Sequence, residues 1–494
     1  MLSVIQKNHP DKTAIIADGK SYTYATLANE SKQFASFLLD KQSDLNEARV
    51  AFMVTAGFDY VKTQWAIWQA GGVAVPLCTT HPLSSLTYVI EDTQAEIIVV
   101  SPIFEVILKD LAIAKNIRFI VLENIDKPDI QALPQITSGR RAMILYTSGT
   151  TNLPKGVVTT HANIEAQVST LIQAWEYSEN DHILCILPLH HVHGIINVVS
   201  CTLWAGGTVE FLPSFSADEV FNWIKSVANS ERNGVFMAVP TIYFKLIAHF
   251  EHLPASEQEQ LTAKMKTFRL MVSGSAALPV SVMEKWEVIS GHRLLERYGM
   301  TEIGMAISNP YQGERRAGHI GQALKGVSVR LVDEQNKEVA TGEAGEIQIK
   351  GANVFQEYWQ KPAATKDTFT DEGWFKTGDV AVLEDSYYRI LGRSSIDIIK
   401  SGGYKISALE IEEVLRTYPN VKDCSVVGID NEEWGELVAA AIVSDDIHLD
   451  TQALNKWMRE KMPTYKVPRL YKIVEELPRN AMGKVTKNDL KKMF

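Results

Sequence analysis

The chain of 494 residues carries 49 Lys and Arg against 59 Asp and Glu, which gives a formal net charge of −10. This acidic balance argues against a nucleic-acid-binding protein and against a protein held on an anionic membrane surface. The length exceeds what one ordinary hydrophobic core supports, so at least two domains are expected.

Most of the chain alternates short β-rich runs with amphipathic helical stretches. Helices are expected at 24–40 and 217–228, and strands at 95–101, 117–122, 183–187, 235–239 and 270–273. Such alternation favours an α/β protein with largely parallel sheets. The apolar stretch 194–209 is shorter than the roughly 20 residues that a membrane span needs. We therefore expect a buried helix that leads into a strand there, and no membrane span.

The pattern changes in the last part of the chain. From about Lys325 to Leu391, short strands with close turns predict an antiparallel lobe. A further unit begins near Ser394, which gives predicted domains at 1–393 and 394–494. Segment 456–494 holds eleven Lys and Arg against four Asp and Glu. This excess indicates either a solvated face or a surface that meets a polyphosphate.

The cysteines and the N-terminal residues indicate the cellular compartment in which the protein is expected. The four cysteines are widely spaced and form no CxxC pair; they are Cys78, Cys185, Cys201 and Cys424. This spacing predicts small buried side chains in a reducing compartment rather than disulfides or a metal site. The first residues show no basic segment followed by a long apolar run. We therefore expect no signal peptide and a cytoplasmic location.

The strongest local signal is the segment Tyr146–Gly156, with the sequence YTSGTTNLPKG. Small residues let backbone N–H groups approach phosphate oxygens, hydroxyls add donors, and Lys155 adds a positive charge. The segment is not a Walker A motif, because Pro154 precedes the lysine. It therefore predicts a different kind of phosphate-binding loop.

Five further segments accompany this loop. They are RYGMTE at Arg297–Glu302, GWFKTGD at Gly373–Asp379, LGR at Leu391–Arg393, KSGGYKIS at Lys400–Ser407 and PRNAMGK at Pro478–Lys484. In this order the six segments resemble the signatures of the adenylate-forming superfamily, and the resemblance covers essentially the whole chain. It implies an α/β fold with a large N-terminal domain of stacked mixed sheets and helices, an antiparallel lobe, and a small mobile α+β C-terminal domain.

The resemblance implies a site for ATP. It assigns Tyr298 to the adenine, Thr301 to phosphate, Glu302 to Mg²⁺, and Asp379 with Arg393 to the ribose. An aromatic face, a hydroxyl donor and a hard oxygen ligand suit the first three roles. The full predicted ATP-binding set is Thr147, Ser148, Gly149, Thr150, Thr151, Lys155, Ser275, Ala276, Tyr298, Gly299, Met300, Asp379 and Arg393.

The resemblance also implies a reaction in two steps, in which a carboxylic acid is joined to AMP with release of pyrophosphate and the acyl group then passes to the thiol of CoA. Lys484, Thr301, Glu302 and His191 are the predicted catalytic residues. The resemblance also places Ser401, Gly402 and Gly403 along the path of the CoA arm, and the two glycines, which have no Cβ, let a narrow chain pass. The C-terminal domain is expected to rotate between the steps about Ser394–Asp397, and its basic tail is a candidate partner for the CoA phosphates.

Arg297 indicates which carboxylic acid is the substrate. An unpaired arginine in an acyl pocket is costly, whereas a second carboxylate on the substrate satisfies it with charge-assisted hydrogen bonds. The surrounding segment closely resembles malonyl-CoA synthetases, so a small dicarboxylic acid such as malonate or methylmalonate is the first prediction. The alternative for Arg297 is pairing with a neighbouring protein acid. His193 is expected to be a packed, hydrogen-bonded histidine.

Other readings of the whole chain stay open at this stage. One is a CoA ligase for a fatty, aromatic or succinylbenzoate-like acid, and another is a stand-alone adenylation enzyme that loads a carrier protein. An oxygenase of the luciferase type is a rarer alternative, and a non-catalytic binding module is disfavoured because nearly every expected catalytic residue type is present. The oligomeric state is open between a monomer and a homodimer.

Overall fold

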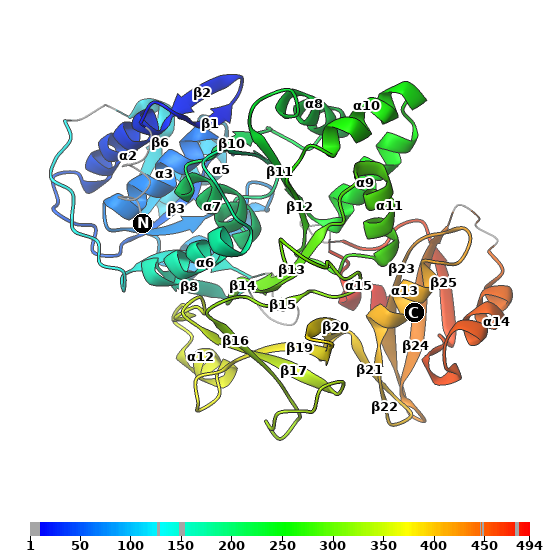
Figure 1. Cartoon of the computed structure of the whole chain (residues 1–494). Helices are drawn as coiled ribbons and strands as arrows, with labels where there is room; N and C mark the ends of the chain where they lie inside the picture. The colour runs from blue at the N-terminus through cyan, green and yellow to red at the C-terminus, as the bar shows by residue number, and fades with distance from the viewer. Residues whose placement is uncertain (1–9, 126–128, 148–153, 445, 447–448, 480–483) are drawn as a thin grey trace.

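The structure is a computed structural model that describes residues 10–125, 129–147, 154–444, 446, 449–479 and 484–494. Four sheets organise the described chain (Figure 1). The helices cover these sheets and connect their strands; they are α2 (Tyr24–Leu39), α3 (Phe58–Gln69), α4 (Leu83–Asp92), α5 (Glu105–Ala114), α6 (His161–Ala174), α7 (Cys201–Trp204), α8 (Ala217–Val227), α9 (Pro240–Glu251), α10 (Ala255–Met265), α11 (Val280–Ser290), α12 (Pro362–Thr368), α13 (Ala408–Leu415), α14 (Thr451–Lys461) and α15 (Lys487–Lys491).

The largest sheet has nine strands. Their order is β15 (Gln322–Ala323), β14 (Gly304–Ser308), β13 (Leu295–Met300), β12 (Leu270–Ser273), β11 (Asn233–Ala238), β9 (Asp181–Cys185), β10 (Thr208–Phe211), β1 (Thr13–Ala17) and β2 (Lys20–Thr23). The strands from β13 to β1 pair in parallel, and the edge strands are antiparallel. The parallel strands are almost entirely buried, as expected where both faces of a sheet are covered.

The second sheet has seven strands and carries the predicted phosphate loop. Its order is β18 (Glu357–Tyr358), β8 (Gly156–Thr160), β7 (Arg141–Tyr146), β4 (Val73–Pro76), β3 (Arg49–Met53), β5 (Ile97–Val100) and β6 (Arg118–Val121). Strands β7 and β8 form an antiparallel pair whose connection is the phosphate loop. The predicted loop therefore joins two adjacent buried strands of this sheet.

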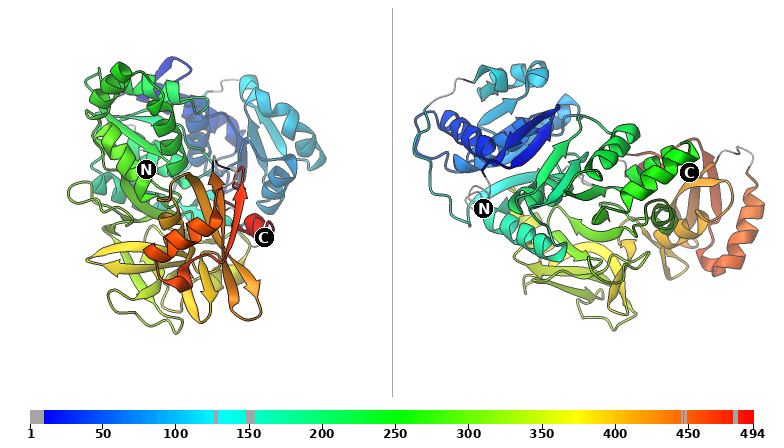
Figure 2. Two further views of the ribbon diagram at one scale, coloured as in Figure 1. Left: turned by 90° about the vertical axis from the view of Figure 1, so that its right-hand side faces the viewer. Right: turned by 45° about the horizontal axis from the view of Figure 1, so that its top comes forward.

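The last two sheets account for the changed pattern in the sequence. The antiparallel lobe consists of β16 (Val327–Val332), β17 (Ala344–Gly351), β19 (Phe375–Glu384) and β20 (Tyr387–Arg393). The C-terminal sheet has the order β22 (Tyr404–Ser407), β21 (Ile398–Ser401), β24 (Gly435–Ser444) and β23 (Val421–Asn431), with β25 (Leu470–Val474) parallel to β24. Its two hydrophobic clusters use only residues from 399 onward. This sheet lies at the right in the right-hand view of Figure 2 and faces the viewer in the left-hand view.

Most predicted elements are confirmed, with ends shifted by a few residues. The apolar stretch 194–209 forms a buried π-helix, His193–Ser200, that continues through α7 into β10. Among the described residues, no helix is long and apolar enough to cross a membrane. The four cysteines are free and buried, as predicted.

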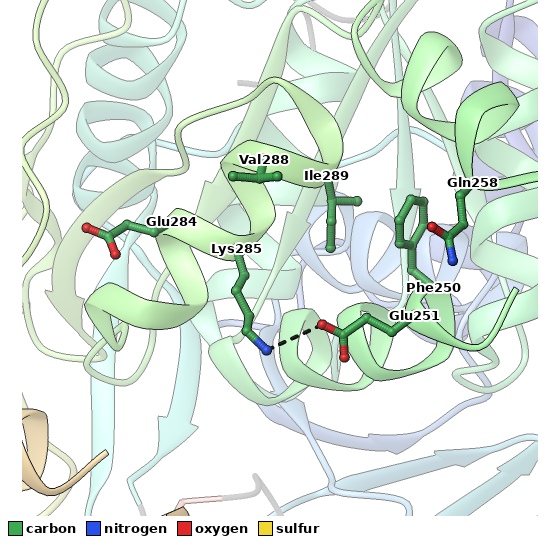
Figure 3. Close-up of a pocket in the computed structure, with 7 residues that line it drawn as sticks. All are labelled: Phe250, Glu251, Gln258, Glu284, Lys285, Val288 and Ile289. Carbon is green, nitrogen blue, oxygen red and sulfur yellow. Dashed lines mark hydrogen bonds and ion pairs between the residues drawn. The ribbon is translucent and has the colours of Figure 1, made fainter. Parts of the chain in front are cut away.

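A surface hollow lies between α9, α10 and α11 (Figure 3). Its lining includes Phe250, Val288 and the ion pair of Lys285 with Glu251, whose atoms lie 3.3 Å apart. None of the predicted site residues lines this hollow. The candidate site therefore has to be built from the residues themselves.

Candidate active site

Three residues predicted for the nucleoside come together from separate segments. Asp379 on β19 lies directly opposite Arg393 on β20, and the Arg393 Nε donates to Asp379 Oδ1 at 3.0 Å. The Tyr298 hydroxyl, at the end of β13, donates to Asp379 Oδ2 at 2.6 Å. Burial and the Asp379 carboxylate raise the pKa of Tyr298, so the phenol stays protonated as the donor. Asp379 is thus held with both oxygens oriented beside a buried aromatic ring.

A backbone hydrogen bond connects the two described residues that flank the predicted phosphate loop. The Thr147 amide donates to the Lys155 carbonyl at 3.1 Å, and Lys155 lies immediately before β8. The Lys155 ammonium sits 4.7 Å from the centre of the Tyr358 ring. The four predicted loop residues Ser148, Gly149, Thr150 and Thr151 lie outside the described residues.

Glu302 lies in the turn after β13 and is only 5% exposed. Burial raises the pKa of its carboxyl, and the Tyr358 hydroxyl donates to Oε1 at 2.9 Å. Among the described residues, no group of three His, Cys, Asp or Glu side chains is placed to hold a metal. Mg²⁺ usually takes one or two carboxylates and completes its shell with phosphates and water. A single oriented carboxylate therefore fits magnesium that arrives with a nucleotide.

Lys484 reaches this region from the C-terminal unit. Burial lowers the pKa of its ammonium, and the nearby cations Arg297 and Arg393 lower it further, whereas Asp379 raises it. The same ammonium contributes, after burial and His190, to the lowered pKa of His191. The predicted catalytic lysine, the ribose residues and the predicted pocket residues thus lie within electrostatic range of one another.

Arg297 lies on β13 and is only 3% exposed. Its Nη2 donates to the Ser275 hydroxyl at 3.3 Å, and that hydroxyl lies 3.2 Å from His193 Nδ1. Arg297 forms no ion pair with a carboxylate among the described residues, and its Nε has no hydrogen-bond partner there. Burial lowers the pKa of its guanidinium to about 9.

The neighbouring acid Glu296 does not neutralise this cation by contact. Successive side chains of a strand point to opposite faces. Accordingly, Glu296 accepts a hydrogen bond from the Leu278 amide at 3.2 Å on the other side. Glu296 is itself buried, which raises its pKa to about 8. The alternative that Arg297 pairs with a protein acid is therefore wrong for the described residues.

Further buried polar atoms that lack a hydrogen-bond partner in the described part of the chain lie on the elements around Arg297. They are His191 Nε2, His193 Nε2, the Asn197 amide and Ser273 Oγ. His193 is buried and packed as predicted, with Nδ1 beside Ser275. Because buried polar groups normally find partners, this set is suited to a polar or anionic ligand.

The predicted CoA residues occupy the β21–β22 hairpin. Gly402 and Gly403 have φ of +57° and +82°, which suits glycine. The hairpin lies against the antiparallel lobe, where Lys405 Nζ is 2.7 Å from Glu334 Oε1 (Figure 1). In this structure Lys484, from the same C-terminal unit, lies near the other predicted site residues. This is the arrangement that we predict for the first step.

Sequence reasoning missed Tyr358, which links Lys155 and Glu302. It also left Ala276, Gly299 and Met300 without individual roles. Gly299 is required by close packing, because a Cβ there meets the Gly304 carbonyl oxygen at 2.0 Å. Only the tertiary contacts single out these positions, since Tyr358 lies far from both partners along the chain.

Residues 3–359 match the model of the AMP-binding enzyme family, and residues 410–484 match that of the AMP-binding enzyme C-terminal domain. This chain belongs to the AMP-binding enzyme family. 

This AMP-binding enzyme is 42% identical to the mitochondrial malonate–CoA ligase ACSF3 of Bos taurus, over 97% of this chain and 88% of the relative. It is 40% identical to a malonate–CoA ligase of Arabidopsis thaliana, over 98% and 86% of the two chains. Among solved structures, ATP-bound MatB from Rhodopseudomonas palustris matches with a TM-score of 0.91 and 32% identity, covering 100% of this chain and 98% of that one. The apo form of the same protein, with equal identity and coverage, matches with a TM-score of 0.81.

Proposed function

We propose that this AMP-binding enzyme is an ATP-dependent ligase that joins malonate to CoA through malonyl-AMP, with methylmalonate as a second substrate. The observation that carries the proposal is the buried Arg297 guanidinium, which lacks a carboxylate partner among the described residues. A buried cation in that state is costly until an anion pairs with it. The free carboxylate of malonate supplies that anion while its other carboxylate reacts. The names of the relatives support the same acid.

In the first step, the reacting carboxylate attacks the α-phosphate of ATP in line, and pyrophosphate leaves. Tyr298, Asp379 and Arg393 hold the nucleoside, while Lys155 and the phosphate loop hold the triphosphate. Lys484 stabilises the charge that gathers at the α-phosphate. Glu302 would hold Mg²⁺, which when bound would offset phosphate charge.

In the second step, the CoA thiol attacks the acyl carbon and AMP leaves. We propose that residues 394–494 form the domain that rotates about Ser394–Asp397 between the steps, so that Ser401, Gly402 and Gly403 replace Lys484 at the site. The TM-scores of 0.91 and 0.81 to the ATP-bound and apo forms of one relative support an ATP-competent arrangement here. We also propose a cytoplasmic location, whereas the relative from Bos taurus is a mitochondrial protein.

The test is CoA-dependent release of AMP from ATP by the purified protein, with acetate, malonate, methylmalonate, succinate, octanoate and benzoate. We expect malonate to be far ahead of acetate and octanoate. Octanoate or benzoate in first place would keep the ligase and refute the role of Arg297. Malonate-dependent pyrophosphate exchange without thioester formation from free CoA would instead favour a carrier-protein thiol as the acceptor.

A further inference from the structure

We propose that Tyr358 is a positioning residue for two groups of the proposed ATP site. Its ring supports the ammonium of Lys155, and its hydroxyl orients the carboxylate of Glu302. This inference rests on the proposed function, because it takes Lys155 as a ligand of the triphosphate and Glu302 as the ligand of Mg²⁺. Two contacts carry it, the 4.7 Å approach of the Lys155 ammonium to the ring and the 2.9 Å hydrogen bond to Glu302 Oε1.

The position of Tyr358 is fixed by the backbone around it. Phe355 N donates to the Glu302 carbonyl at 2.7 Å, Gln356 N to the Val158 carbonyl at 2.9 Å, and Trp359 N to the Gly156 carbonyl at 2.7 Å. Segment 355–359 is therefore tied at one end to the turn that carries Glu302 and at the other to the strand that follows Lys155. A side chain from this segment has its direction set before any ligand arrives.

The side chain itself is enclosed. Tyr358 is 6% exposed, and its ring packs against Phe355 with centroids 4.8 Å apart. The hydroxyl donates to Glu302 Oε1 at 2.9 Å. A hydroxyl that donates to one carboxylate oxygen leaves the other lone pairs available to a cation.

The ring has a separate role toward the lysine. An ammonium has three donors, so one side can rest on an aromatic face while the other donates to phosphate oxygens. A long lysine side chain held in this way loses less rotamer freedom when the triphosphate binds. The ring therefore contributes to ATP binding without a metal, whereas the hydroxyl contributes only when Mg²⁺ is present.

Two substitutions separate these roles. Tyr358→Phe removes the hydroxyl and keeps the ring, whereas Tyr358→Met removes the ring and fills the space with a flexible apolar chain. Tyr387→Phe is the matched control, because Tyr387 is a buried tyrosine of the antiparallel lobe whose hydroxyl donates to the Glu314 carbonyl at 2.9 Å. All variants are first compared by thermal unfolding.

The measurements are calorimetric ATP binding in EDTA and the Mg²⁺ concentration for half-maximal pyrophosphate exchange. For Tyr358→Phe, we expect unchanged ATP affinity in EDTA and an increase of about 10- to 100-fold in the Mg²⁺ requirement, as for other partners of metal ligands. For Tyr358→Met, we expect ATP affinity in EDTA to fall by about 2- to 30-fold. Tyr387→Phe should match the unmodified protein in both measurements.

An unchanged Mg²⁺ requirement in Tyr358→Phe would overturn the role of the hydroxyl. Either equal or tighter metal-free ATP binding by Tyr358→Met would overturn the role of the ring, and tighter binding would further show that the ring competes with the triphosphate. The phenylalanine variant keeps the packing, so its result decides the first role even if the methionine variant does not fold. An unmodified protein that binds no ATP would refute the proposed function itself.

Discussion

The Nζ atom of Lys487 lies 2.7 Å from Asp397 Oδ1 and 2.9 Å from Glu412 Oε1. Lys487 follows Lys484 by three residues, Asp397 ends the proposed hinge, and Glu412 lies on α13. Burial alone would lower the pKa of Lys487, but the two carboxylates outweigh burial and raise it. This buried ion pair fixes the segment after the predicted catalytic lysine to the core of the C-terminal unit.

We predict that Lys487→Met destabilises the protein by about 3–5 kcal/mol, because it leaves the half-buried Asp397 carboxylate without its cation and the buried Glu412 with Arg416 alone. Urea unfolding measures the change. Lys492→Met is the control, since the side chain of Lys492 is 75% exposed and forms a surface ion pair with Asp489. Equal stability of the two variants would contradict the prediction.

Lys484→Ala should lower the rate of malonate-dependent pyrophosphate exchange by about 10²- to 10³-fold, the usual cost of losing one preorganised charge. Conversion of preformed malonyl-AMP to malonyl-CoA should be retained, because Lys484 serves only the first arrangement. Rapid-quench measurement of each step decides this. An equal loss of rate in both steps would contradict the proposal that Lys484 acts only in the first step.

The pH dependence of the first step follows from the lowered pKa of Lys484. The ammonium is present below its pKa and is lost as the pH rises through it. Because burial and two nearby cations hold that pKa below the ordinary 10.5, the alkaline limb of pyrophosphate exchange should fall at a lower pH than for an exposed lysine. The pH–rate profile of the pyrophosphate exchange measures this, and a limb at or above pH 10.5 would refute it.

Arg297→Ala should lower kcat/KM for malonate by about 10²- to 10³-fold, as for loss of one partner of a buried charge pair. Activity with acetate or octanoate should not fall, since these acids have no second carboxylate. Arg293→Ala is the control, because Arg293 forms a half-exposed ion pair with Glu287. Survival of malonate activity in Arg297→Ala would exclude the dicarboxylate site.

Gly274→Ala tests the same site without removing the charge. A Cβ at Gly274 would lie 2.6 Å from the guanidinium carbon of Arg297, so the flexible guanidinium has to move. We expect a higher KM for malonate with little change in stability. Gly139→Ala, where a Cβ meets nothing within 4 Å, should leave KM unchanged. Equal KM values for the two variants would show that the position of Arg297 does not matter.

The sequence by itself determined the α/β class, the antiparallel lobe and the order of the site segments, because local patterns and short motifs carry that information. The tertiary structure decided which groups meet. The alternation of side chains on β13 sends Glu296 and Arg297 to opposite faces, which left Arg297 without an acid among the described residues. Tyr358 contacts Lys155 and Glu302 from far along the chain, and such contacts depend on how sheets and segments pack, which no local pattern encodes.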